Sequence, residues 1–305
     1  MILVIGEILF DLFPDDRRIG GAPFNFAFHL RQLGFDVRFI SRVGKDSLGN
    51  ELKAFLHRNG FPAEDLQTDT THATGRVTVS LTPDGSHSFD IVRDTAYDHL
   101  EFNDHLKKLC TAPPELIYFG TLIQRTDNGR ALVKNCLSAA GPTGIKFCDI
   151  NLRPACYTPE VVADAVAAAD ILKLSDEELH RLDSAQEPTQ KASLETQIKN
   201  LARSSDIDTV ILTRGEKGSI WATRENILSH PVPSEDTAED NTAIADTVGA
   251  GDAYAAMAAA GRLNGLPDGR TMSLAQEFAS RICSIRGALP QSPSFYTDFK
   301  RGLSR

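Results

Sequence analysis

The sequence lacks the features that mark secreted, membrane and nucleic-acid-binding proteins. Its 305 residues include five cysteines, an odd number without paired metal spacing, which indicates reduced thiols. No run approaches about 18 consecutive apolar residues, so no membrane-spanning helix is expected. Acidic residues outnumber basic ones, 41 to 32, which disfavours binding to nucleic acid or to a membrane surface. Residues 1–7 lack the basic start of a signal peptide, so the cytoplasm is the expected location.

Common site signatures are also missing. The eight histidines are scattered, without the His pair or His/Cys cluster of a zinc site. Gly44-Lys45 does not complete a P-loop. Gly249 and Gly251 do not form a dinucleotide fingerprint, because Tyr254 replaces the third small residue and no apolar strand precedes them. A protein-built metal site and the two commonest phosphate motifs are therefore not expected.

The chain does carry a glycine-rich segment, residues 246–252, that leads directly into a predicted alanine-rich helix over 253–261. Gly249 and Gly251 lack Cβ atoms, so their N–H groups can approach a ligand at the positive end of the helix dipole. Asp252 would lie beside this anion site as a candidate base. A tight loop with an acidic dipole partner would explain the same residues, so this segment alone leaves both interpretations open.

Two carboxylates lie in an apolar segment near the N-terminus. Residues 2–13 are predicted to form a strand that begins buried and contains Glu7 and Asp11. Acids in such a strand need a reason. They are either acceptors for substrate hydroxyls or, for Asp11, a residue at the exposed end of the strand.

A second pair of glycines precedes a helix in the next segment. Pro23 suits the first turn of this helix and Gly34 its C-terminal stop, so Gly20-Gly21 repeats the glycines-before-helix arrangement. Asn25, one turn into the helix, is expected to point toward the loop that also receives Asp11.

The periodicity changes to two at about residues 73–95, around a Pro-Asp-Gly turn. This pattern predicts a β-hairpin inserted in an α/β chain. A hairpin cannot bury a face alone, so it is expected to cover a substrate cleft as a lid and to pair with a second lid in a homodimer.

Strands and helices alternate after the hairpin, which predicts one α/β domain over 1–305 with a doubly wound, mostly parallel sheet flanked by helices. Ligands of such sheets bind outside the carboxyl ends of the strands. Residues 218–230 are predicted to form two short strands, 184–197 an exposed connection, 234–241 a solvated acidic loop and 271–286 the final helix.

Together these motifs resemble the ribokinase (PfkB) family of ATP-dependent sugar kinases, and more closely its fructokinase-like members. Residues 20–25 with Leu33-Gly34 look like the N-terminal signature, and residues 246–252 like the C-terminal one. Three shorter motifs, at 149–153, 173–178 and 213–218, stand between them in the expected order. The match covers nearly the whole chain. Two departures are Ser175, where Asn is common, and Val248, where Thr is common.

The resemblance implies a ribokinase-like fold whose small β lid is formed by the 73–95 hairpin with a contribution near 10–19. It implies ATP and Mg²⁺ as cofactors, together with a monovalent cation, usually potassium. Catalysis would be carried by Asp252 as general base, by Gly249, Ala250 and Gly251 as the anion hole, and by Arg153 at the transferred phosphate. Sugar contacts would come from Asp11, Gly20, Gly21, Asn25, Arg93 and Asn151. Nucleotide contacts would come from Lys173, Ser175, Thr213, Gly215, Gly218 and the anion-hole glycines. Glu178 would hold Mg²⁺ through water, and Asp246, Val248, Ile282, Ile285 and Gly287 would bind the monovalent cation, mostly through the backbone.

The expected reaction is phosphorylation of a free hexose such as fructose. Ribose, a nucleoside or a sugar phosphate are alternative substrates for a kinase of the same fold. A non-catalytic sensor of sugar or nucleotide is a second class, disfavoured by the presence of Asp252 together with both glycines.

Overall fold

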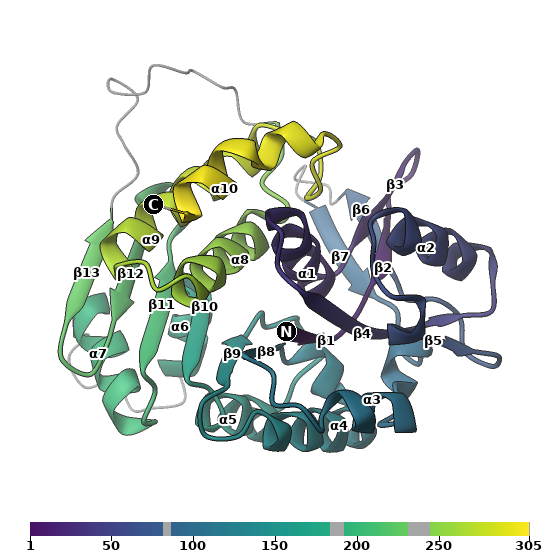
Figure 1. Ribbon diagram of the computed structural model, residues 1–305, viewed down its shortest axis with the longest axis horizontal. Helices are drawn as coiled ribbons and strands as arrows, with labels where there is room; N and C mark the ends of the chain where they lie inside the picture. The colour runs from purple at the N-terminus through teal and green to yellow at the C-terminus, as the bar shows by residue number, and fades with distance from the viewer. Residues whose placement is uncertain (82–86, 184–191, 231–244, 305) are drawn as a thin grey trace.

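A nine-stranded sheet forms the centre of the computed structural model, which describes residues 1–81, 87–183, 192–230 and 245–304 (Figure 1). The strand order is β13-β12-β11-β10-β9-β8-β1-β4-β5. Neighbouring strands run parallel except at β11–β12 and β12–β13. The strands are β1 (Ile2–Ile5), β4 (Val37–Gly44), β5 (Leu66–Asp69), β8 (Leu116–Phe119), β9 (Ile145–Asp149), β10 (Ile171–Ser175), β11 (Thr209–Thr213), β12 (Ser219–Ala222) and β13 (Ile227–His230). The predicted doubly wound, mostly parallel α/β fold is confirmed.

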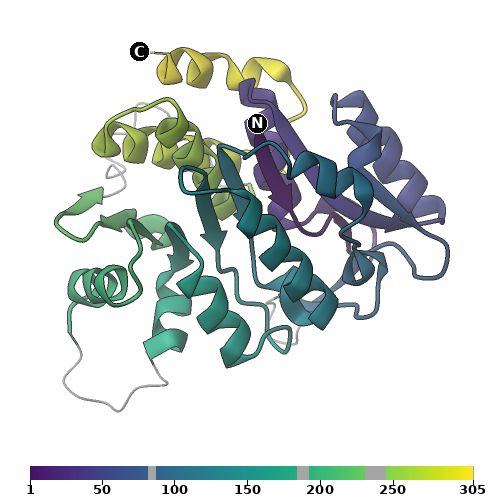
Figure 2. The same cartoon turned by 60° about the horizontal axis from the view of Figure 1, so that its bottom comes forward.

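Helices cover both faces of this sheet (Figures 1 and 2). Alternate residues of β1 enter two separate cores, Ile2 and Val4 in one and Leu3 and Ile5 in the other, which is why the strand is apolar throughout. The first core is completed by α1 (Ala22–Leu33), α2 (Ser47–Arg58), α8 (Ala250–Leu263), α9 (Asp268–Cys283) and α10 (Thr297–Leu303). The second is completed by α3 (Asp104–Leu109), α4 (Asp127–Ala139), α5 (Pro159–Ala167), α6 (Asp176–Asp183) and α7 (Leu194–Ser204).

None of the helices in the described ranges has the length and apolar content needed to cross a membrane.

A second, four-stranded sheet projects from one side of the molecule (Figure 1). Its order is β3-β2-β6-β7, with strands β2 (Leu9–Leu12), β3 (Arg17–Gly20), β6 (Arg76–Leu81) and β7 (His87–Ile91). Strands β6 and β7 form the hairpin predicted from the period-two pattern, and β2 pairs with β6 in parallel. The turn of the hairpin lies outside the described residues. We call these four strands the small sheet.

The prediction of one strand over 2–13 is wrong. Strand β1 ends at Ile5 in the large sheet, whereas β2 begins at Leu9 in the small sheet. The chain leaves the large sheet at Gly6. Only glycine fits there, because its φ is 155° and a Cβ atom would lie 2.4 Å from the side chain of Pro23. Both halves are apolar, so the hydrophobic pattern contained no signal for the break.

Two other predicted boundaries need correction. Helix α7 begins at Leu194, inside the predicted exposed connection, because Ile198 and Ala202 form a short buried stripe in a polar segment. Helix α9 spans Asp268–Cys283 and is followed by α10, so it is not the final helix. Residues 184–191 and the acidic loop at 234–241 lie outside the described residues. The two short strands over 218–230 are present as β12 and β13.

Candidate active site

The strand order places a switch point beside β1. From β1 the chain continues to β4 and β5 on one side of the sheet, and later to β8 and β9 on the other. Open α/β sheets bind ligands at such a point, outside the carboxyl ends of the strands. A narrow cavity at this place is lined by Glu7 after β1, Gly120 after β8, and Asp149, Asn151 and Arg153 at and after the end of β9.

Helix α8 begins in the expected glycine-rich segment. Gly249 is its N-cap and has a left-handed φ of 80°, and Asp252 is the acidic residue of the first turn. The first N–H groups of a helix have no helical carbonyl one turn earlier to bind, so they can face an anion; here Ala250 N makes a 3.3 Å bond to the Thr247 carbonyl oxygen in the preceding turn. Tyr254 anchors the helix to β12, since its hydroxyl donates to Ser219 Oγ at 2.7 Å and accepts from Trp221 Nε1 at 2.8 Å.

Asp252 lies among charged and polar groups from four other segments. Its Oδ2 accepts a hydrogen bond of 2.7 Å from Asn25 Nδ2, so Asn25 points at Asp252. Burial raises the pKa of Asp252 to about 6, and the negative charge of Asp149 adds to this. The hydrogen bond from Asn25 and the charges of Lys173 and Arg153 act in the opposite direction. Such a carboxylate is ionised at neutral pH and can still accept a proton from a substrate.

Lys173 brings a buried positive charge to the same loop. Its Nζ donates to both carboxylate oxygens of Asp149, at 3.0 and 2.9 Å, and both side chains are buried. Burial acts to lower the pKa of Lys173, but the charges of Asp149, Glu178 and Asp252 together with the hydrogen bond to Asp149 outweigh it, so the pKa is raised. The same Nζ lies 3.5 Å from the position that a Cβ would take on Gly251. The ammonium group therefore lies next to the anion site of α8.

Two further carboxylates border the site, Glu7 from the segment after β1 and Asp11 from β2. Burial raises the pKa of Glu7 to about 7 and that of Asp11 to about 6, and Arg153 opposes both shifts. The two glycines before α1 are needed for close packing against these acids. A Cβ would come within 2.6 Å of Asp11 Oδ2 at Gly20 and within 2.6 Å of the Glu7 carbonyl oxygen at Gly21.

The expected nucleotide residues gather at the carboxyl ends of β10 and β11. Ser175 is paired with Thr213 in this part of the sheet, two residues beyond Lys173. The turn after β11 is closed by a hydrogen bond of 2.9 Å from Arg214 N to Gly218 O. Gly215 and Gly218 both have positive φ there, at 55° and 79°. This edge continues directly from the α8 anion site.

Comparison with known proteins identifies the family of this chain. A family model described as pfkB family carbohydrate kinase matches residues 2–294. The chain belongs to the pfkB carbohydrate kinase family. It is therefore an ATP-dependent sugar kinase, and the resemblance inferred from the five motifs is confirmed.

Relatives of this pfkB kinase include enzymes with different substrates. It is 27% identical to a probable fructokinase-5 of Arabidopsis thaliana, with 96% of this chain and 94% of that protein covered. It is 29% identical to an aminoimidazole riboside kinase of Salmonella typhimurium, with 83% and 78% covered. One similar solved structure is a fructokinase double mutant of Vibrio cholerae O395 with fructose, ADP and a potassium ion bound. It superposes on this chain with a TM-score of 0.77 at 21% sequence identity. The superposition covers 97% of this chain and 96% of that chain.

Arg93 is the expected sugar residue that the structure does not bring to this group. Its Nη2 donates to the Ala155 carbonyl oxygen at 2.6 Å. It lines a cavity of about 360 Å³ with Asp98 and Arg125, and that cavity contains none of the residues around Asp252. The pfkB kinase thus has a larger cavity beside its candidate active site, formed on the side of η2 (Ala96–His99) and α5.

Glu178 of the pfkB kinase makes a backbone-binding contact that the sequence did not predict. Its carboxylate accepts from Leu152 N at 2.6 Å and from Ser175 N at 2.8 Å, while Ser175 Oγ accepts from Glu178 N at 3.2 Å. This reciprocal pair is a capping box at the start of α6. Glu178 therefore connects the segment after β9 to the end of β10, beside the expected phosphate site.

The expected cation residues of the pfkB kinase gather around Asp246. The carboxylate accepts from Val248 N and Gly287 N, both at 3.1 Å, and from Arg18 Nη1 at 2.7 Å. The carbonyl of Ile282 accepts from Ile285 N at 3.1 Å at the end of α9.

Sequence reasoning missed Arg18 and the partner role of Asp149. Asp149 stands in one of the quoted motifs, and its position at the end of a buried strand was the available signal. Arg18 carried no signal, because a basic residue two positions before a Gly-Gly turn is typical of a solvated strand end.

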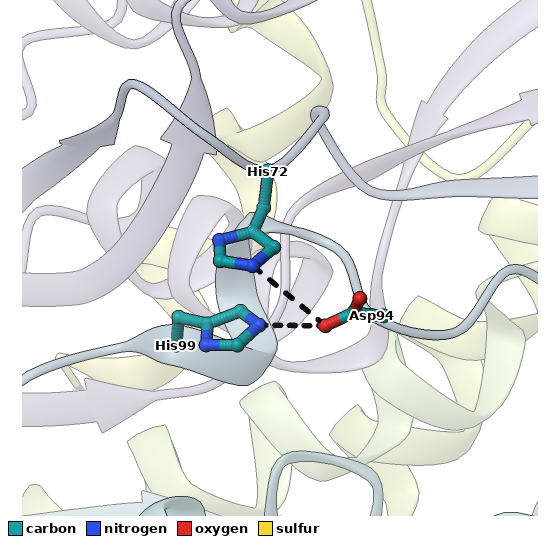
Figure 3. Close-up of side chains that lie close together, drawn as sticks. All are labelled: His72, Asp94 and His99. Carbon is teal, nitrogen blue, oxygen red and sulfur yellow. Dashed lines mark hydrogen bonds and ion pairs between the residues drawn. The ribbon is translucent and has the colours of Figure 1, made fainter.

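A group of three potential metal ligands lies elsewhere, at the base of the small sheet (Figure 3). Asp94 Oδ1 lies 2.8 Å from His99 Nε2 and 3.8 Å from His72 Nε2, and His72 Nδ1 contacts the buried Asp69 at 3.1 Å. The two imidazole rings are stacked, with centroids 3.5 Å apart and planes 11° apart. Two histidines that ligate one ion must each hold it in their own ring plane, which parallel stacked rings cannot do. In this conformation the group is held by carboxylate–imidazole contacts and ring stacking and does not form a metal centre.

Proposed function

We propose that this enzyme transfers the γ-phosphoryl group of ATP to a hydroxyl of a free hexose such as fructose, with Asp252 as general base. The observation that carries the proposal is the Asp252–Asn25 pair at the N-terminus of α8, with Lys173 Nζ beside Gly251. A base, an anion site and a buried cation within one turn of helix are the groups that phosphoryl transfer to an alcohol requires.

The proton and bond changes follow from this arrangement. Asn25 occupies Oδ2 of Asp252, which leaves Oδ1 to accept the proton of the sugar hydroxyl. The hydroxyl oxygen forms its bond to the γ-phosphorus while the bond from that phosphorus to the bridging oxygen of ADP breaks. General-base help of this kind contributes about 10² to 10⁴-fold.

Electrostatic stabilisation accounts for most of the remaining catalysis. The N–H groups of Gly249, Ala250 and Gly251, the dipole of α8 and the ammonium of Lys173 would face the charge of the transferring group. Arg153, which is exposed at the mouth of the narrow cavity, would contact the transferred phosphate. The small sheet would act as the lid that excludes water from the reaction.

The sugar would lie between the narrow cavity and the small sheet. Asn25 Oδ1 is buried without a hydrogen-bond partner among the described residues, so a sugar hydroxyl that donates to it would satisfy a polar atom. Asp11 and Asn151 would accept further hydroxyls, with Gly20 leaving room for the Asp11 carboxylate and Gly21 for the backbone at Glu7. Arg93 would contact the sugar only after breaking its hydrogen bond to the Ala155 carbonyl oxygen.

The nucleotide would lie along the ends of β10 and β11, against Ser175, Thr213, Gly215 and Gly218. The donor set fits Mg²⁺ held through water. Each Glu178 oxygen accepts one N–H and keeps a second lone pair for a water ligand, and Mg²⁺ characteristically retains several waters. The ion would neutralise part of the negative charge on the phosphate oxygens of ATP.

The pH dependence of activity tests the role of Asp252. Its raised pKa means that the base is protonated, and so inactive, below about pH 6. We expect kcat/KM for the sugar to fall tenfold per pH unit below that point and to be level above it. The measurement is kcat/KM at saturating Mg-ATP from pH 5 to pH 9. An acid limb near the ordinary aspartate pKa would contradict the buried base.

Two glycine variants separate loop shape from anion binding. At Gly249 a Cβ would lie 2.3 Å from the Cβ of Ala288 at a φ of 80°, so Gly249→Ala is expected to lower the free energy of unfolding by roughly 2 kcal/mol or more. At Gly251 a Cβ makes ordinary contacts with the Lys173 side chain, the nearest 3.5 Å from Nζ, so Gly251→Ala is expected to fold normally and to lose affinity for ATP. Chemical denaturation and ATP titration measure the two effects. Equal stability losses in both variants would refute the distinction.

A substrate panel tests the identity of the acceptor. Initial ADP formation is measured with fructose, ribose, other hexoses, fructose phosphates and nucleosides, with Mg²⁺ present. A clear preference for a free hexose supports the proposal. A riboside is the second candidate, favoured by the similarity to the aminoimidazole riboside kinase. A response to nucleosides alone would replace the hexose with this class, and a lack of turnover with every acceptor would favour a sensor.

We further propose a homodimer through the lid, in the cytoplasm where ATP is available. The small sheet has β3 and β7 as its edge strands, and a sheet of this size gains stability from a partner on its open face. Light scattering on the purified protein tests the dimer, which is expected to dissociate when the lid hairpin is deleted.

A further inference from the structure

The small sheet contributes one arginine to the loop before α8. Arg18 lies on β3, directly opposite Asp11 in the β2–β3 pairing. Its guanidinium leaves the small sheet and binds Asp246 Oδ2 through Nη1 at 2.7 Å. Both side chains are largely buried, with 21% and 16% of their surfaces exposed. A guanidinium bound to a carboxylate in such a place is a durable contact and not a solvated surface pair.

Other groups hold this guanidinium in place. Its Nε donates to Asp16 at 3.2 Å, and its central carbon lies 4.5 Å from the centre of the Phe13 ring. The stem of the side chain lies over the backbone at Gly287, because a Cβ on Gly287 would lie 3.6 Å from Arg18 Cδ. Arg18 is thus fixed by a carboxylate, a ring and a backbone surface.

Two of the groups expected to ligate a monovalent cation, the Asp246 carboxylate and the Ile282 carbonyl, are already engaged. The Asp246 carboxylate accepts three hydrogen bonds, from Arg18, Val248 N and Gly287 N. Val248 and Gly287 thus direct N–H groups toward the point where a cation would need oxygen. The Ile282 carbonyl is bonded to Ile285 N. A bare cation at Asp246 would have to displace a guanidinium of the same charge, so these residues do not fit the ion.

The anion-hole loop packs against the segment whose backbone binds Asp246. Gly249, the N-cap of α8, packs so closely on the next segment that a Cβ would lie 2.9 Å from the Cα of Ala288, the residue after Gly287. An unneutralised Asp246 carboxylate would therefore place a negative charge three residues before the N-cap of a helix that must receive phosphate. Like charges at such separations cost free energy even with solvent screening.

We propose that the Arg18 guanidinium replaces the monovalent cation at Asp246, so that this kinase neutralises its anion-hole loop from the lid and does not need potassium. The expected effect on the reaction rate rests on the proposed function. The claim that Arg18 occupies the place of the cation rests only on the contacts of Asp246. Arg18 touches neither substrate, so it is a positioning residue. Because β3 belongs to the lid, movement of the lid would also move the charge that compensates Asp246.

The test compares Arg18→Met with Arg17→Met at constant ionic strength, with choline chloride exchanged for potassium chloride. Methionine keeps most of the stem and removes the charge. Arg17 is the matched control, because it is the preceding arginine of β3 and makes an exposed pair with Glu51. Thermal stability is measured without substrates, and ADP formation with Mg-ATP and sugar. The stability readout remains informative even if the sugar assignment is wrong.

The wild-type protein and Arg17→Met are expected to show the same Tm and rate in both salts. Arg18→Met is expected to lose roughly 10- to 100-fold in rate in choline, the range for a lost charge-assisted hydrogen bond, and to regain Tm and rate as potassium is added. A saturable rise in the wild-type Tm with potassium, absent with lithium, would overturn the proposal. The proposal would also be overturned if Arg18→Met had the same Tm and the same rate in choline as the wild-type protein.

Discussion

Asp252→Asn is expected to lower turnover by at least about 10³-fold while sugar and ATP bind nearly as tightly as to the wild type. The amide cannot accept the hydroxyl proton, but it retains the shape and the contact with Asn25. The substitution is also expected to stabilise the free protein at pH 8 by roughly 1–2 kcal/mol. The pKa of Asp252 is raised by burial, so its ionised form is disfavoured in the folded state above the ordinary aspartate pKa, and this cost disappears in the variant. Turnover, binding and denaturation measure the three effects.

Asp268→Asn provides the matched control for this variant. Asp268 is the acidic residue in the first turn of the neighbouring helix α9 and lies outside the candidate site. It is expected to retain wild-type turnover and to lose a few tenths of a kcal/mol in stability, the usual value of a carboxylate near a helix N-terminus. Turnover by Asp252→Asn within about tenfold of the wild type would remove Asp252 from the base role.

Lys173→Met is expected to lower the free energy of unfolding by about 3–5 kcal/mol at pH 8, because it leaves the Asp149 carboxylate buried without its partner. The loss should shrink as the pH falls toward 4. An unpaired buried carboxylate has a raised folded-state pKa, so its cost is present above the ordinary aspartate pKa and is relieved by protonation. Urea denaturation at several pH values measures both the loss and its pH dependence.

The double variant Lys173→Met with Asp149→Asn separates pairing from packing. Removal of both charges is expected to recover most of the stability, whereas phosphoryl transfer should remain low because the ammonium beside Gly251 is gone. A single Lys173→Met variant as stable as the wild type would show that Asp149 is not held by this pair.

The sequence predicted the elements whose local signals agreed with the fold. Helix α1 combines Pro23 at its start with a left-handed Gly34 at its end, and α8 follows a glycine with a positive φ, so their boundaries could be predicted closely. Apolar alternation and short turns defined the hairpin. The position of Asp252 at the start of α8 followed from these signals, and so did the gathering of Ser175 and Thr213 at one edge of the sheet.

The remaining features depend on tertiary contacts that no local pattern carries. The break between β1 and β2 depends on Gly6 packing against Pro23, which is 17 residues later in the chain. Asn25 was expected near Asp11, but its amide binds Asp252, a partner 227 residues away in the sequence. Arg18 and Asp246 are 228 residues apart, so their ion pair could be found only once both segments were placed.

The most direct test of the account is simultaneous measurement of ADP and phosphorylated sugar from the wild-type enzyme with Mg-ATP and fructose. We predict ADP formation that depends on the sugar and an equal amount of fructose phosphate, with both products almost abolished in Asp252→Asn. ADP formation that does not require a sugar, or that proceeds unchanged in Asp252→Asn, would contradict the central claim that Asp252 directs the phosphoryl group to a sugar hydroxyl.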